Sequence, residues 1–124
     1  MSALSDDIVK YFQGSGLIDG FSIQFGSFVE GNENYYLAIL PDSGSTARPW
    51  MRSPRYRVMI FGKKGMSNFS GNKSVGEVAD NLVNYIRLNS SSELHQLIDC
   101  TEPLNLGTTD SNRAVMQIAL TTKS

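Results

Sequence analysis

Residues 56–88 read YRVMIFGKKGMSNFSGNKSVGEVADNLVNYIRL. The first six of them are β-branched or aromatic, with only Arg57 interrupting the apolar run, so they predict a strand covered on at least one face. Gly62 ends that strand. Ser74 and Glu77 stand three residues apart, which is the spacing of a capping box at a helix N-terminus. The stretch therefore predicts a strand, a glycine-rich loop and a helix that begins at Ser74.

The predicted helix has an apolar stripe along one side. Residues recur there at helical spacing: Val75, Val78, Ala79, Leu82, Val83 and Ile86. The opposite side carries charged and amide side chains: Glu77, Asp80, Asn81, Asn84 and Arg87. Such a stripe has to be buried against another element, and a sheet that contains the strand 56–61 is the natural partner.

The loop between strand and helix resembles a phosphate-binding loop only in part. That motif needs a glycine, four residues, and then Gly-Lys-Ser/Thr, so that consecutive amides surround the phosphates. Here five residues separate Gly65 from Gly71, and Asn72 stands before Lys73. We therefore interpret the loop as a connector that leads to the helix cap, and not as a nucleotide site.

Further elements flank this stretch on both sides. Leu4, Ile8, Tyr11 and Phe12 share one helical face, and Gly14 and Gly16 follow them. Strands are expected at 21–25 and 35–40 before the stretch, and at 94–101 and 114–121 after it. Residues 103–112 hold Pro103, Gly107 and Asp110-Ser111-Asn112, so we expect a connection with turn chemistry there.

These elements predict an α+β fold in the order α-β-β-β-α-β-β. We expect one mostly antiparallel mixed sheet, with two helices packed on one face and a long arm between the second and third strands. In the last strand, Ala114, Met116, Ile118 and Leu120 should face one way, while Arg113, Val115, Gln117 and Thr121 face the other. At 124 residues, the chain 1–124 is expected to form a single domain.

Composition excludes several classes of protein. No apolar run approaches the ~20 residues of a membrane span, and the N-terminus has no signal pattern, so we expect a soluble protein made in the cytosol. Cys100 is the only cysteine and His95 the only histidine, which leaves no disulfide and no Cys/His zinc cluster within the chain.

The charges cancel overall but are unevenly placed. Residues 1–42 hold six acids and one base, residues 43–73 hold seven bases and no acid, and residues 74–124 hold six acids and three bases. A basic middle and acidic ends allow the chain to pair with copies of itself. The same bases could form a strip for nucleic acid: Arg48, Arg52, Arg55, Arg57, Lys63, Lys64 and Lys73.

The segment from Pro41 to Pro54 is long and rich in proline, which rules out a tight hairpin. It combines large apolar side chains with arginines, a composition favoured at protein interfaces. We predict a subunit interface there, formed by Arg48, Trp50, Met51, Arg52 and Arg55.

No catalytic group is predicted. Residues five apart on a strand point to opposite faces, so His95 and Cys100 do not form a catalytic pair. Asp6 and Asp7 fit the first turn of a helix better than a cation site. Asp99, Glu102 and Asp110 are interpreted as a solvated rim, and no cofactor or metal is expected.

Taken in order, these features resemble the small tail terminator, or tail completion, proteins of long-tailed bacteriophages. The resemblance covers nearly the whole chain. It includes the Gly16 to Gly20 turn, the strand that ends at Pro41, the arginine-rich entry into Tyr56, the 74–88 helix and the Asp110 to Arg113 segment. The serine- and glycine-rich loop 62–74 departs from the pattern.

The resemblance implies a structural virion protein without catalysis or cofactor. It would assemble in the host cytoplasm as a hexameric ring on the head-proximal end of the tail tube, stop tube polymerisation and present the surface that joins the head. Its partners would be itself, the tail tube protein and the head-tail connector protein, with DNA passing through the lumen and no membrane. The alternatives are a connector or neck protein of the same particle and, from another class, a small nucleic-acid-binding module.

Overall fold

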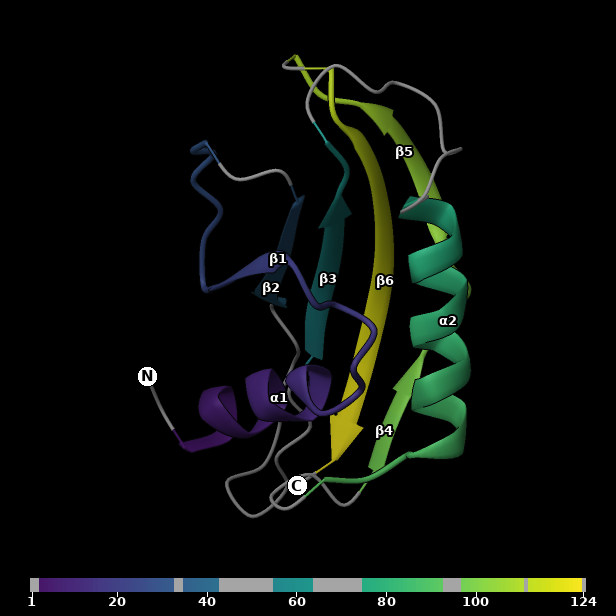
Figure 1. Cartoon of the computed structure of the whole chain (residues 1–124). Coiled ribbons are helices and arrows are strands. Elements are labelled where there is room, and N and C mark those ends of the chain that lie inside the picture. Colours follow the sequence, from purple (N-terminus) through teal and green to yellow (C-terminus); the bar gives the residue numbers. More distant parts are fainter. Residues whose placement is uncertain are drawn as a thin grey trace.

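A computed structural model describes residues 3–32, 35–42, 55–63, 75–92, 97–110 and 112–123 of the chain. Its helices and strands follow one another as shown in Figure 1. They are α1 (Ala3–Gln13), β1 (Phe21–Phe25), β2 (Tyr35–Asp42), β3 (Arg55–Phe61), α2 (Val75–Leu88), β4 (Leu97–Cys100), β5 (Leu104–Thr108) and β6 (Ala114–Lys123). The strand and helix predicted within residues 56–88 are therefore confirmed as β3 and α2.

The strands form one mixed sheet in the order β1-β2-β3-β6-β4, and β5 also pairs with β6. β1 runs parallel to β2, and the other pairs are antiparallel. Because β6 is ten residues long, its first half pairs with β5 and its second half with β4. The predicted α+β fold with a mostly antiparallel sheet is confirmed.

Strand β5 corrects the interpretation of residues 103–112 as a connection. Leu104 and Asn105 pair with β6, the register shifts before Gly107, and Gly107 has a φ of 89°. Gly107 does adopt a left-handed backbone conformation, but it lies in a β-bulge within a strand and not in a turn. A bulge can need the same left-handed conformation as many turns. The observed order therefore gains one strand between β4 and β6.

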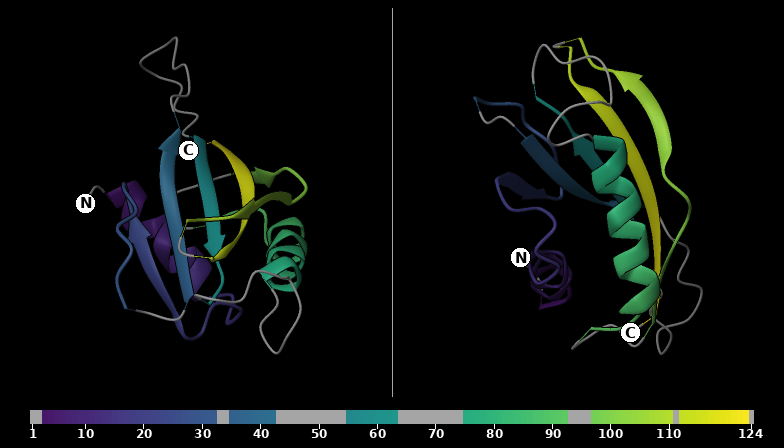
Figure 2. Two further views of the ribbon diagram at one scale, coloured as in Figure 1. Left: turned by 90° about the horizontal axis from the view of Figure 1, so that it is seen from above. Right: turned by 45° about the vertical axis from the view of Figure 1, so that its right-hand side comes forward.

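Both helices pack on the same face of the sheet, as predicted. The buried residues of α2 are those of its apolar stripe: Val75, Ala79, Leu82, Val83 and Ile86. They share one core with Ile8 and Phe12 of α1 and with Ala114, Met116, Ile118 and Leu120 of β6. Figure 2 shows α2 running along the sheet in front of β6. The alternation predicted for the last strand is confirmed by these contacts.

The opposite face of the sheet, which we call the second face, is covered at one end by the segment after β1. Phe28 stacks on Phe61 with ring centroids 4.1 Å apart, and it meets Tyr36 edge-on at 5.2 Å. The Gln24 side chain donates a hydrogen bond to the Val29 carbonyl and accepts one from the Val29 N–H, both at 2.8 Å. This end of the second face is therefore a small separate core.

The side chain of Arg113 is buried beside this small core. Its side chain is only 2% exposed, its Nε donates to the Glu30 carboxylate at 2.6 Å, and its Nη1 donates to the Gly62 carbonyl at 2.9 Å. The guanidinium also lies 5.0 Å from the centre of the Tyr36 ring. A buried arginine is tolerated only when its charge and its donors are matched, and these contacts provide that match.

The end of β3 packs tightly against the start of α2, and this contact gives a first prediction. A Cβ added at Gly62 would lie 2.7 Å from Val75 Cγ2. Overpacking of this kind costs on the order of 1–3 kcal/mol of unfolding free energy. We expect Gly62→Ala to lower the urea midpoint accordingly.

The double variant Gly62→Ala/Val75→Ala serves as the control for that prediction. Val75→Ala removes the clashing methyl group, so the double variant should lose less stability than the sum of the two single variants. If the stability losses of the two single variants simply add in the double variant, the Gly62–Val75 contact is not the cause of the loss in Gly62→Ala.

Candidate interaction surface

The predicted interface residues fall largely outside the described part of the chain. Arg48, Trp50, Met51 and Arg52 lie in the segment 43–54, which the structure does not describe. Arg55 is described: it begins β3, is exposed, and stands in register between Asp42 and Thr121. His95 and most of the loop 62–74, including the expected cap residue Ser74, also lie outside the described residues.

The half of the second face away from the Phe28 core is open to solvent and basic. Arg55 and Arg57 are exposed on β3, and strand alternation places Lys123 of β6 on the same face. Leu40 and Met59 lie half-buried beside them. Among the described residues, neither arginine forms an ion pair. We call this area the open sheet face.

The edge of the sheet beside β6 is apolar. Every residue of β5 is exposed, and this edge carries Leu97, Leu104 and Leu106 with exposed fractions of 50%, 55% and 44%. Exposed edge strands usually carry charges or are covered, since they pair readily with other chains. Leucines on a fully exposed edge strand are therefore typical of a surface that associates with another protein.

The layer formed by the helices is acidic. Exposed acids lie on both helices and on the turn after α1: Asp6, Asp19, Glu77 and Asp80. The bases of this layer are Lys10 on α1 and Arg87 on α2, and Arg87 pairs with Glu102 of the β4–β5 connection. We call this area the helix layer.

The acids and the thiol considered as candidate sites lie apart or serve local roles. The Asp99 carboxylate accepts a hydrogen bond from the Cys100 amide at 2.8 Å, Glu102 pairs with Arg87, and Asp110 is exposed in the turn after β5. Cys100 is half-buried, and burial raises the pKa of its thiol. Within the described ranges, no three His, Cys, Asp or Glu side chains are placed to hold a metal ion.

Two tyrosines have raised pKa values. Burial, followed by repulsion from Tyr85 and Cys100, raises the pKa of Tyr11, whose hydroxyl donates to the Asn89 carbonyl at 2.5 Å. Burial, followed by the charge of Asp7, raises the pKa of Tyr56. Both phenols are therefore held in the neutral form in the folded protein.

These shifts predict an alkaline limit to stability. Both pKa values are higher in the folded state than the ordinary value of about 10 in the unfolded chain. The contribution of these tyrosines to the free energy of unfolding is therefore complete below about pH 10. It is lost as the pH rises through the folded values. We expect the melting temperature to fall above that pH, and to fall less steeply in Tyr11→Phe. Identical alkaline slopes for the two proteins would contradict the role of Tyr11.

Sequence reasoning missed two features of these surfaces. It placed Arg113 on the outer side of the last strand, which is the correct face, but did not predict its burial against Glu30, 83 residues earlier. It divided the charges by position along the chain, whereas the structure divides them between the two faces of the molecule. The pattern Arg55-x-Arg57 within an alternating strand was the available signal for a basic sheet face.

None of the curated proteins compared with the chain matches it significantly. No helix in the described ranges has both the length and the apolar character needed to cross a membrane. A family model described as "Phage tail termination protein" matches residues 1–124, which is the entire sequence. The chain therefore belongs to the phage tail termination protein family.

Proposed function

We propose that the protein forms a ring, most simply a hexamer, that caps the head-proximal end of the phage tail tube. The ring stops tube polymerisation and offers the surface to which the head is joined. The observation that carries the proposal is the family match over the whole chain, which assigns a structural role in tail completion. The protein acts by assembly and not by catalysis, and it needs no cofactor.

The partners follow from that position in the particle. One side of the ring contacts the tail tube protein, the other contacts the head-tail connector protein, and DNA passes through the lumen. Closed rings use two different patches on each subunit. The basic open sheet face and the acidic helix layer are two such patches on this chain.

We assign the subunit contact suggested by the sequence to the segment 43–54 and the adjoining Arg55. The segment supplies an aromatic side chain, a flexible apolar side chain and two guanidinium groups, and side chains of these kinds contribute strongly to interface energies. They are Trp50, Met51, Arg48 and Arg52. Arg55 supports the proposal because it is exposed at the point where this segment rejoins the sheet.

The test is to inactivate the gene in the phage that encodes it and to measure tails by electron microscopy. We expect tails of uncontrolled length that fail to join heads, and restoration of uniform length when the wild-type chain is supplied in trans. Immunogold labelling of restored particles should mark the head-proximal end of the tail. Tails of normal length without the gene product would overturn the proposal.

A further inference from the structure

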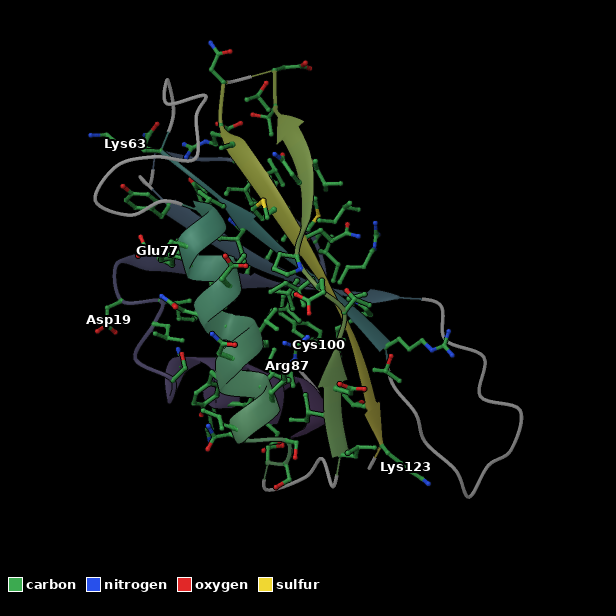
Figure 3. All side chains as sticks on the ribbon, turned by 90° about the vertical axis from the view of Figure 1, so that its right-hand side faces the viewer. Asp19, Lys63, Glu77, Arg87, Cys100 and Lys123 are labelled. Atoms are coloured by element: carbon green, nitrogen blue, oxygen red, sulfur yellow. The ribbon has the colours of Figure 1, made fainter. Side chains whose placement is uncertain are left out.

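The two faces of the molecule carry opposite charge. The helix layer exposes Asp6 and Asp80, together with Asp19 and Glu77. The open sheet face exposes Arg55, Arg57 and Lys123. Figure 3 shows Asp19 and Glu77 on the helix side of the molecule, with Lys123 on the far side of the sheet.

Three of these charges have no counter-charge bound to them in the described part of one copy. Among the described residues, Arg55, Arg57 and Asp80 form no ion pair. Asp99, an acid on the open sheet face, accepts a hydrogen bond from the backbone amide of Cys100. Arg87, the base at the end of α2, is engaged by Glu102. Each face therefore presents charged side chains that a partner of opposite charge can bind.

We infer that the helix layer of one copy docks onto the open sheet face of the next copy, so that Asp80 meets the arginines of β3. This inference rests on the proposed ring and names its subunit contact. Arginine side chains bind carboxylates through paired hydrogen bonds, and complementary charge selects the partner surface. Two open sheet faces, or two helix layers, would bring like charges together. The charge pattern therefore selects a head-to-tail contact, the kind that closes into a ring.

Apolar groups accompany the charges on both surfaces. Leu40 and Met59 lie half-buried where the open sheet face meets the small core, against which they pack, and Leu104 of β5 is 55% exposed. On the helix layer, Leu88 at the end of α2 is 84% exposed. Specific protein interfaces usually combine apolar groups with charged groups at the rim.

The test uses charge reversal on the two faces. Arg57→Glu and Asp80→Lys are supplied, separately and together, to the phage whose own copy is inactivated. Each single variant repels its identical neighbour at every contact, so each should lower infectious titre at least about tenfold and give tails of uncontrolled length. Supplied together, the two variants can alternate around a ring, and every contact then joins opposite charges. Co-expression should therefore restore titre and tail length.

A matched control separates this contact from general effects of charge. Asp110→Lys makes the same change as Asp80→Lys, but it lies in the turn after β5, outside both surfaces, so it should complement like wild type. All three variants alter exposed residues, and unchanged melting temperatures will verify that they fold.

The remaining outcomes overturn the inference. If both reversal variants complement alone, or if both fail and co-expression restores nothing, the helix layer does not dock on the open sheet face. If Arg57→Glu fails while Asp80→Lys complements, the open sheet face contacts another anion, for which DNA phosphate is the candidate. Loss of tail-length control on gene inactivation would leave the proposed function standing in each of these cases.

Discussion

Trp50→Ala should leave the monomer folded and abolish the control of tail length. Trp50 has the largest apolar surface in the segment 43–54, and a proline-rich segment of a small domain gains little by exposing it to water. The proposed burial against a neighbouring subunit accounts for it. Truncating an interface tryptophan commonly costs on the order of 2 kcal/mol or more, and a closed ring repeats that loss at every subunit boundary.

Two measurements decide this prediction. The melting temperature of the purified variant should match that of the wild-type protein, while complementation of the gene-inactivated phage should yield tails of variable length. Trp50→Phe retains an aromatic ring and should restore most of the length control. If Trp50 instead packs on its own sheet, Trp50→Ala will lower the melting temperature, and the segment will be intramolecular cover and not a subunit contact.

Arg113→Ala should cause the largest loss of stability among the variants considered. The change leaves the Glu30 carboxylate and the Gly62 carbonyl without the cation that serves both, and it removes the group that faces the Tyr36 ring. Breaking a fully buried ion pair costs about 3–5 kcal/mol, and because the Glu30 carboxylate is 29% exposed we expect a loss near the lower end of that range. Urea denaturation should show a correspondingly lower midpoint for Arg113→Ala.

The ion pair between Arg87 and Glu102 provides the control, because both of its side chains are largely exposed. Arg87→Ala should change the urea midpoint little, since water screens exposed pairs. A second variant, Arg113→Met/Glu30→Met, replaces the buried guanidinium and its partly exposed carboxylate partner by apolar groups and should recover part of the loss. Equal midpoints for Arg113→Ala and Arg87→Ala would contradict the role of Arg113 as the closure of the small core.

Elements whose signals are local could be predicted from the sequence. The apolar stripe of α2 recurs every three or four residues, and the alternation of β6 has a period of two, so both reflect backbone geometry within a few residues. The α+β class followed from the order of these elements. The family resemblance likewise depended on the order of short features along the chain, and the family match agrees with it.

Features that depend on distant partners could be seen only in the folded chain. Strand β5 carries turn residues and becomes a strand because β6 offers it a free edge. Arg113 is buried because Glu30 and Gly62, 83 and 51 residues away, supply its acceptors. The division of charge into an acidic helix layer and a basic sheet face arises when the sheet brings β3 and β6 together and leaves both helices on the other side. These outcomes follow from pairing across the fold, where the energy of a contact depends on groups that no short stretch of sequence contains.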